Sequence, residues 1–326
     1  MKVFIAGGSG ALGTPLITQL RAAGHEVVAM TRSPGKTSAL ERLGAEVAVA
    51  DAFDRDAVTR AVTLAEPEVL IHQLTALSGV TNYKHFDREF ALTNRLRTEG
   101  TDNLLAAARG AGVRRFIAQS YGGWPYERTG GMIKTEEAPL DPNPPAEQRQ
   151  SLAAIRHLEA AVTAAEELEG VVMRYGGFYG PGTSVSLDGD IAELVRKRKF
   201  PIVGRGTGMW SFAHIEDAAS ATVAAVDRGA PGIYNVADDD PAQVSAWLPA
   251  LARELGARPP QRIPAWLGRM IAGEVQFSMM TQIRGISNAK AKREFGWTPR
   301  YPSYREGFSS GLGNGQPARA PVGSTR

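Results

Sequence analysis

Short apolar runs alternate with amphipathic segments along most of the chain. The runs expected to form strands are Lys2–Ala6, Glu26–Met30, Glu46–Val49, Val69–His72, Arg115–Gln119 and Gly170–Tyr175. The segments expected to form helices are Leu12–Ala23, Ser38–Leu43, Arg55–Leu64, Phe90–Arg109 and Gln148–Leu168. Strands and helices that alternate in this way predict right-handed βαβ units, with a parallel sheet covered on both faces.

A glycine-rich turn, Gly7-Gly8-Ser9-Gly10-Ala11-Leu12-Gly13, separates the first strand from the first helix. The first glycine of this spacing permits a tight turn, the second lets the backbone approach a pyrophosphate, and the third lets the helix pack tightly on the sheet. Because the turn opens a βαβ unit, it favours dinucleotide binding over a plain turn. The contacts expected from it are Gly7, Ser9, Gly10, Ala11, Leu12 and Gly13.

The end of the second strand indicates which nucleotide is bound. An NAD site places an acidic residue there to hold the ribose 2′-hydroxyl, whereas this chain reads Thr31-Arg32-Ser33. The Arg32 guanidinium can clamp a 2′-phosphate, and Ser33 and Lys36 can add hydrogen-bond donors. We therefore predict NADP(H) as the cofactor, with contacts from Thr31, Arg32 and Ser33.

Together these features predict an α/β fold: a Rossmann-type, doubly wound parallel sheet with a smaller, mainly helical carboxyl-terminal lobe. The dinucleotide-binding domain is expected at residues 1–175 and 211–236, and the substrate lobe at 176–210 and 237–308. Residues 309–326, which are polar and rich in Gly and Pro towards their end, are expected to form a flexible tail. Arg128–Pro145 has a loop composition.

Composition narrows the functional classes. The 326 residues include no Cys, which excludes disulfides and Cys nucleophiles, and the five scattered His predict no metal site. The net charge is +3, but basic and acidic residues are interleaved, so we discount nucleic acid as a partner. No run is apolar enough for a membrane span, and the first strand does not read as a signal peptide. We expect a cytoplasmic protein, and a homodimer is one assembly that it can form.

Several further motifs resemble the extended branch of the short-chain dehydrogenase/reductase superfamily, the epimerase/dehydratase-like group. They are Asp51-Ala52, Asn94, the segment Arg174–Gly182, His214-Ile215-Glu216-Asp217, Gly232–Val236 and Lys290–Pro299. The resemblance covers the chain to about Phe308. It implies further cofactor contacts from Asp51, Ala52, Gln73, Leu74, Asn94, Tyr175, Gly177 and Phe178.

The catalytic Tyr-x-x-x-Lys motif of that superfamily is missing. No Tyr in the chain is followed four residues later by Lys, and the register of the helix puts Ser151 and Ile155 at the two positions. Tyr121 stands where the resemblance places a substrate-orienting hydroxyl. Because ligands bind at the carboxyl ends of strands in such sheets, we expect Tyr121 or Ser120 to polarise a substrate oxygen.

The substrate lobe also departs from the sugar enzymes of the group, because Trp210 stands where an Arg often meets a nucleotide phosphate. A set of aromatic and Met residues is expected to line the pocket: Trp124, Tyr126, Tyr179, Trp210, Met279 and Met280. Such residues suit a flat, apolar ligand better than a nucleotide sugar.

The sequence thus predicts an atypical NADP(H)-dependent oxidoreductase that acts on a carbonyl or activated alkene of a small, partly apolar metabolite. Two alternatives stay open. One is a nucleotide-sugar-type epimerase, dehydratase or lyase that retains bound NAD(P). The other is a non-catalytic NADP-binding sensor or scaffold, which the loss of Tyr-x-x-x-Lys makes a serious option.

Overall fold

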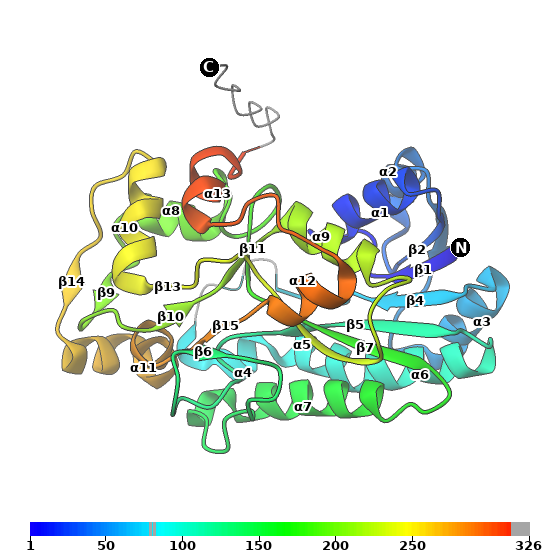
Figure 1. The fold of residues 1–326 in the computed structure, drawn as a ribbon, viewed down its shortest axis with the longest axis horizontal. Coiled ribbons are helices and arrows are strands. Elements are labelled where there is room, and N and C mark those ends of the chain that lie inside the picture. The colour runs from blue at the N-terminus through cyan, green and yellow to red at the C-terminus, as the bar shows by residue number, and fades with distance from the viewer. Residues whose placement is uncertain (78–79, 81–82, 314–326) are drawn as a thin grey trace.

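The computed structural model describes residues 1–77, 80 and 83–313 (Figure 1). Its centre is a sheet of seven parallel strands in the order β12-β7-β5-β4-β1-β2-β3. The strands are β1 (Lys2–Ala6), β2 (Glu26–Thr31), β3 (Glu46–Val49), β4 (Val69–His72), β5 (Arg115–Tyr121), β7 (Glu169–Tyr175) and β12 (Gly232–Val236). The strand order reverses between β1 and β4, which creates the crevice where ligands bind in doubly wound sheets.

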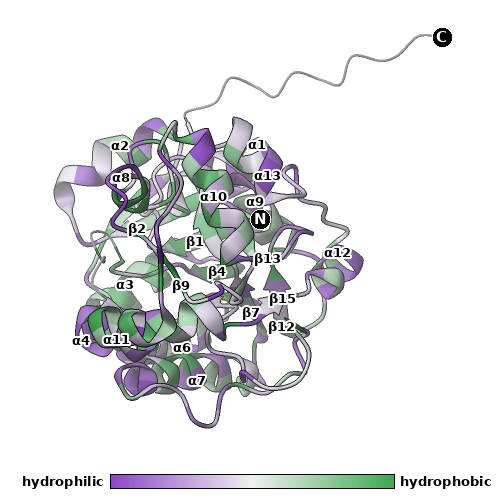
Figure 2. Cartoon of the chain, turned by 90° about the vertical axis from the view of Figure 1, so that its left-hand side faces the viewer, coloured by the Kyte–Doolittle hydropathy of each residue, from purple (hydrophilic) through white to green (hydrophobic). Residues whose placement is uncertain are grey.

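Helices cover both faces of this sheet, as the apolar runs predict. One layer contains α1 (Gly13–Ala22), α2 (Thr37–Arg42), α9 (Ile215–Ala224) and α12 (Ala289–Phe295). The other contains α3 (Arg55–Ala65), α6 (Thr101–Gly110) and α7 (Arg149–Thr163). Apolar residues gather in the interior between the layers (Figure 2). The predicted doubly wound α/β fold is confirmed.

The predicted helix over Phe90–Arg109 is divided into three parts. It consists of α5 (Ala91–Arg95), a π-helical turn labelled η3 (Leu96–Gly100) and then α6. A π turn inserts an extra residue into the helix and shifts the side chains that follow it, and such turns are frequent at functional sites. This one lies beside the carboxyl end of the sheet, where it contacts α7.

Two other boundaries differ from the prediction by more than one residue. α7 ends at Thr163 rather than near Leu168, and Glu166 and Glu167 follow, where a negative charge opposes the helix dipole. β5 continues past Gln119 to Tyr121, because its last two residues still pair with Arg174 and Tyr175 of β7.

The second lobe has its own hydrophobic core. Its main elements are β9 (Ile202–Val203), β14 (Arg262–Ile263), α8 (Asp190–Arg196), α10 (Val244–Glu254), α11 (Ala265–Thr281) and α13 (Tyr304–Ser310). Leu312 packs into this core, and its carbonyl accepts a hydrogen bond from the backbone N–H of Leu187. The expectation that the tail begins at residue 309 is therefore wrong for residues 309–313. Residues 314–326 lie outside the described residues.

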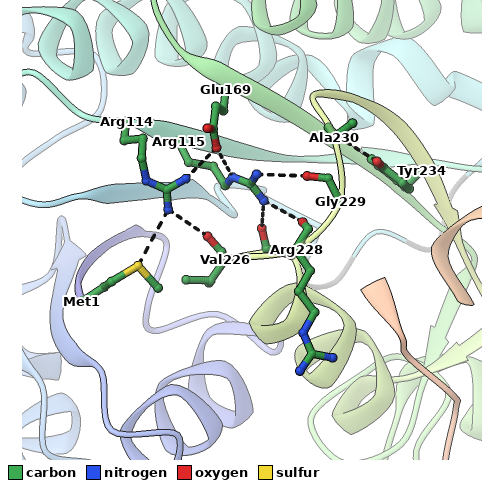
Figure 3. A network of polar contacts seen from close by, with 10 residues as sticks. Met1, Arg114, Arg115, Glu169, Val226, Arg228, Gly229, Ala230 and Tyr234 are labelled. Carbon is green, nitrogen blue, oxygen red and sulfur yellow. Dashed lines mark hydrogen bonds and ion pairs between the residues drawn. The ribbon is translucent and has the colours of Figure 1, made fainter. Parts of the chain in front are cut away.

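The amino-terminal edge of the sheet is held by a polar network around the start of β5 (Figure 3). Arg115 donates to Glu169 at 2.7 Å and to the carbonyl oxygens of Ala225, Arg228 and Gly229 at 2.6–3.0 Å. Arg114 shares the same carboxylate at 2.6 Å. Every branch of the buried Arg115 side chain is thus satisfied, which fixes β5 and β7 to the chain between α9 and β12.

Candidate active site

The glycine turn lies at the carboxyl end of β1, at the reversal point of the sheet. Gly7 has φ +100°, and a Cβ added there would lie 2.8 Å from the Gln73 carbonyl oxygen. The backbone N–H of Gly10 donates to the Gly7 carbonyl at 3.1 Å. A Cβ at Gly10 would meet only that carbonyl, at 3.3 Å, so the side of Gly10 that a Cβ would occupy is otherwise open. This is the arrangement that backbone approach to a phosphate requires.

Two glycines pack the turn itself. A Cβ at Gly13 would lie 2.3 Å from the carbonyl oxygen of Gly8, so Gly13 packs against the turn rather than directly on the sheet. A Cβ at Gly8 would lie 2.8 Å from the Cβ of Ala29 in β2, so Gly8 provides the close approach to the sheet. Of the neighbouring positions, Leu12 is buried and Ala11 is exposed.

The end of β2 faces the turn through hydroxyl groups. The Ser9 and Thr31 hydroxyls lie 3.4 Å apart, and the Ser33 backbone N–H donates to the Thr31 hydroxyl at 3.2 Å. Arg32 is exposed and makes no hydrogen bond or ion pair with the described residues. A cation that has no partner among the described residues is available to a phosphate.

The other predicted cofactor contacts in this half lie at neighbouring strand ends. Asp51 follows β3 and its carboxylate accepts from the Phe53 N–H at 3.0 Å, while the Ala52 carbonyl accepts from Asn103 at 2.9 Å. Gln73 and Leu74 follow β4 and lie against the would-be Cβ of Gly7. The carboxyl ends of β1, β2, β3 and β4 therefore bring all of these residues to one edge.

At the other strand ends, where the resemblance places the nicotinamide, the predicted contacts are less uniform. The Tyr175 hydroxyl is 2.6 Å from that of Thr222 and its ring is buried in the core, so its side chain is occupied away from the edge. Gly177 and Phe178 lie in β8 (Gly177–Tyr179), where they are partly exposed. The Asn94 amide donates to the Ser151 hydroxyl at 2.9 Å, so this side chain is directed to α7.

The positions of the missing Tyr and Lys are filled by residues that transfer no proton. Ser151 is fully buried and donates its hydroxyl proton to Asp87 at 2.6 Å. The same carboxylate accepts the backbone N–H groups of Gln150 and Ser151 at 2.9 and 2.8 Å, which caps the start of α7. Ile155, one turn later, is buried and apolar. The pair is therefore replaced by a structural contact.

Ser120 belongs to a buried network rather than to an open site. Its hydroxyl donates to Glu159 at 2.7 Å, and the two Glu159 oxygens also accept from Arg174 at 2.8 and 2.6 Å. Arg174 donates to the Tyr126 hydroxyl at 2.8 Å, which in turn donates to Asn235 at 2.7 Å. The structure thus argues against catalysis by Ser120 and against Tyr126 as a pocket residue, because both hydroxyl protons are committed.

Tyr121 is on the opposite face of β5 from Ser120 and is half-buried. Burial, with a contribution from Tyr83, raises the pKa of the Tyr121 phenol, although the nearby Arg97 guanidinium acts in the other direction. The phenol therefore stays protonated. It can donate a hydrogen bond but is a weak acid.

An aromatic cluster adjoins Tyr121. The Trp124 ring lies 6.4 Å from the Tyr121 ring and 5.3 Å, edge-on, from Phe86. The members of the cluster are Tyr83, Phe86, Phe90, Trp124, Trp210, Val275 and Met279. The structure thus brings together three predicted pocket residues, Trp124, Trp210 and Met279. Of the other three, Tyr126 belongs to the Ser120 network, and Tyr179 and Met280 are fully buried in the lobe core, where packing occupies them, so they do not line a pocket.

Arg97, in the π turn, has no counterpart in the sequence-based prediction. Its side chain is buried, its Nη1 has no hydrogen-bond partner, and burial lowers its pKa to about 10. Glu159 and Tyr121 are the groups that act on it most strongly after burial. Nearby His72 contacts Thr101 at 3.1 Å, and burial lowers its pKa to about 4, which makes it a neutral wall residue. Only the fold reveals Arg97, because a π turn has no sequence signature.

Comparison with known proteins agrees with this geometry. Residues 3–237 match the NAD dependent epimerase/dehydratase family. The chain belongs to this family. A 3-diazoavenalumate denitrifying reductase of a Streptomyces species is 43% identical over 313 residues, which cover 94% of this chain and 99% of the relative.

Solved structures of the family share the fold. The UDP-glucose 4-epimerase of Thermotoga maritima, solved with UDP-glucose, has a TM-score of 0.75 at 21% identity, with coverage of 95% of this chain and 96% of the epimerase. A human epimerase family protein solved with NADPH has a TM-score of 0.72 at 19% identity, covering 95% of this chain and 92% of the human protein.

This epimerase/dehydratase-family protein is therefore an enzyme of the NAD(P)-dependent oxidoreductase type. Within the described part of the chain, no helix is long and apolar enough to cross a membrane, and no group of His, Asp and Glu is arranged to hold a metal ion.

Proposed function

We propose that this enzyme uses NADPH to reduce the diazo group of a small aromatic compound, with release of N₂. The observation that carries the proposal is the replacement of the family's proton-transfer pair. Ser151 is bound to Asp87, Ile155 is apolar, and the phenol of Tyr121 has a raised pKa. A site built in this way suits a hydride transfer that is not coupled to a proton transfer.

The chemistry of the two candidate acceptors differs in that respect. A carbonyl that accepts hydride becomes an alkoxide and needs a proton from a positioned acid. A diazonium group that is replaced by hydride leaves as N₂, so that Ar–N₂⁺ and NADPH give Ar–H, N₂ and NADP⁺. Atoms and electrons balance without a proton. The relative with 43% identity bears the name of a denitrifying reductase of a diazo compound, which supports this acceptor over a carbonyl or an alkene.

The residues at the strand ends fit a phosphorylated dinucleotide. The open side of Gly10 suits the pyrophosphate, and Arg32, which is exposed and has no partner in the described part of the chain, suits a 2′-phosphate. When bound, the cofactor would supply the hydride. The protein's part is to hold it against the edge at which β4 and β5 end.

The aromatic cluster beside Tyr121 supports a flat substrate. Aromatic rings prefer offset or edge-on contacts with one another, and Trp124, Phe86 and Phe90 already show both kinds. Tyr121 lies at the border of this cluster and keeps its proton, so its hydroxyl can donate a hydrogen bond to an oxygen on the ring.

The test uses the diazonium compound made from 3-amino-4-hydroxybenzoate. We expect the protein to oxidise NADPH with this compound and to release N₂ and 4-hydroxybenzoate in equal amounts, faster than NADPH alone does. 4-Hydroxybenzaldehyde serves as the carbonyl comparator. Reduction of the aldehyde without N₂ release from the diazonium compound would overturn the proposal and restore the carbonyl acceptor.

A further inference from the structure

The structure describes three arginines that are almost completely buried. The exposed fractions are 4% for Arg115, 4% for Arg174 and 5% for Arg97. Arg115 is bound by Glu169 and three carbonyls, and Arg174 by Glu159 and the Tyr126 hydroxyl. The Arg97 side chain makes no hydrogen bond or ion pair with any described residue, and its Nη1 is buried without a partner. It is the exception to the rule that buried charges are paired.

Glu159, the anion with the strongest electrostatic effect on Arg97, does not neutralise the Arg97 charge. Glu159 acts on Arg97 electrostatically, but its two oxygens are already occupied by Arg174 and by the Ser120 hydroxyl. One carboxylate thus faces two guanidinium groups, and one positive charge remains uncompensated. Holding such a charge away from water is costly for the folded protein, so its presence calls for an anion that the chain itself does not provide.

The place of Arg97 limits what this anion can be. The π turn that carries it contacts α7, and the guanidinium interacts with Tyr121 at the end of β5 and with His72 at the end of β4. These strand ends lie on the reaction side of the sheet, whereas the glycine turn and Arg32 lie with β1 and β2. The phosphates of a dinucleotide are therefore already provided for elsewhere.

We infer that Arg97 is a binding site for an anionic oxygen, a phenolate or a carboxylate, on an aromatic substrate. Its planar fork of N–H groups suits such an oxygen. The inference rests on the proposed function for the aromatic nature of the substrate. In a diazo compound whose ring hydroxyl is ionised, addition of hydride and departure of N₂ leave a negative charge on the ring oxygen, and Arg97 and the Tyr121 hydroxyl would stabilise it there.

Binding of unreactive probes tests this site without any turnover. The protein loaded with NADPH is titrated with benzoate against benzamide, and, in buffer alkaline enough to ionise it, with 4-nitrophenol against 4-nitroanisole. We expect the wild type to prefer at least one anion over its neutral partner by roughly 10- to 150-fold, the worth of a charged hydrogen bond. Which pair shows the preference tells whether the oxygen is a carboxylate or a phenolate.

Substitution then assigns the preference to one side chain. Arg97→Met should abolish it, and Arg97→Lys should retain part of it. The matched control is Arg88→Gln, in the exposed part of α4 (Phe86–Glu89), which should leave the preference unchanged. The melting temperature of unliganded Arg97→Met should be equal to or above that of the wild type, because an uncompensated charge has been removed.

Two results overturn the inference. One is an anion preference that survives in Arg97→Met, or no preference in the wild type. The other is a clear fall in the melting temperature of both Arg97→Met and Arg97→Lys with unchanged probe binding by the folded fraction, which is what a purely structural arginine would show. A third result separates the two proposals. If Arg97→Met loses the anion preference but the wild type releases no N₂ from the diazonium compound, the proposed function is refuted and the anion site is retained.

Discussion

At the amino-terminal edge of the central sheet, the buried Arg115 meets a carboxylate and three carbonyls that the chain itself supplies (Figure 3). At the carboxyl edge, the equally buried guanidinium of Arg97 meets neither among the residues that the structure describes. The same side chain in the same degree of burial is thus satisfied at one edge and unsatisfied at the other. The amino-terminal edge is complete as folded, whereas the carboxyl edge is arranged for atoms that come from outside the chain.

The largest effect, on cofactor binding, is expected from a side chain added to the glycine turn at the carboxyl edge. Gly10→Val should abolish NADPH binding with the fold intact, because the new side chain would occupy the open side of the turn and meets only the Gly7 carbonyl. Fluorescence titration with NADPH measures the binding, and circular dichroism reports the fold. The matched control is Gly110→Val at the end of α6, where an added Cβ meets nothing within 4 Å. A folded Gly10→Val protein with wild-type affinity would remove the turn from the cofactor site.

The amino-terminal edge should respond in stability instead. Arg115→Met leaves three carbonyls and the Glu169 carboxylate without a donor, so we expect a loss of about 3–5 kcal/mol in the free energy of unfolding. Urea denaturation measures it. Arg114→Met is the control, because Arg114 shares Glu169 but is half-exposed, and its loss should be much smaller. A loss below about 1 kcal/mol for Arg115→Met would mean that the network in Figure 3 does not hold the edge.

The two halves of the carboxyl edge also differ in how far the sequence predicts them. The roles of the glycine turn and Arg32 can be predicted from the sequence of one βαβ unit, because they depend on neighbours close in sequence. The commitment of Ser120 to Glu159, and that of Tyr126 to Arg174, depend on contacts 39 and 48 residues apart. The sequence shows that a hydroxyl stands at the end of the strand. It does not show which group already accepts a hydrogen bond from that hydroxyl.

Arg97 is another residue whose environment the sequence does not predict. In the sequence it reads as one more charged residue in a helix between Phe90 and Arg109. The π turn that buries it arises only when η3 packs on α7, so no local pattern indicates it. The absence of the Tyr-x-x-x-Lys pair, by contrast, is a property of the sequence alone, and the structure adds the reason: Ser151 has become a cap contact for α7.

A substitution of Arg32 tests the cofactor preference of the nucleotide-binding part of the carboxyl edge. Arg32→Ala should weaken NADPH binding by about 1–3 kcal/mol, the scale of a lost charged hydrogen bond, and leave NADH binding nearly unchanged. Parallel titrations with the two cofactors give the difference directly. Lys36→Ala, at the end of η1 (Pro34–Lys36), measures how much of the effect is general positive charge. Equal affinity of the wild type for NADPH and NADH would be incompatible with a 2′-phosphate clamp.

The smallest effect is expected at Tyr121, the residue from which the sequence predicts the catalytic hydroxyl. If Tyr121 were a positioned acid, Tyr121→Phe would lower turnover by roughly 10²- to 10⁴-fold. Its raised pKa and the diazo acceptor indicate a hydrogen-bond donor instead, so we expect turnover of the diazonium compound to fall only about 2- to 13-fold, the equivalent of about 0.5–1.5 kcal/mol. Single-turnover rates with NADPH measure this step, and NADPH titration verifies that binding persists. A fall of a thousandfold with intact binding would make Tyr121 the proton donor after all, and would favour a carbonyl substrate.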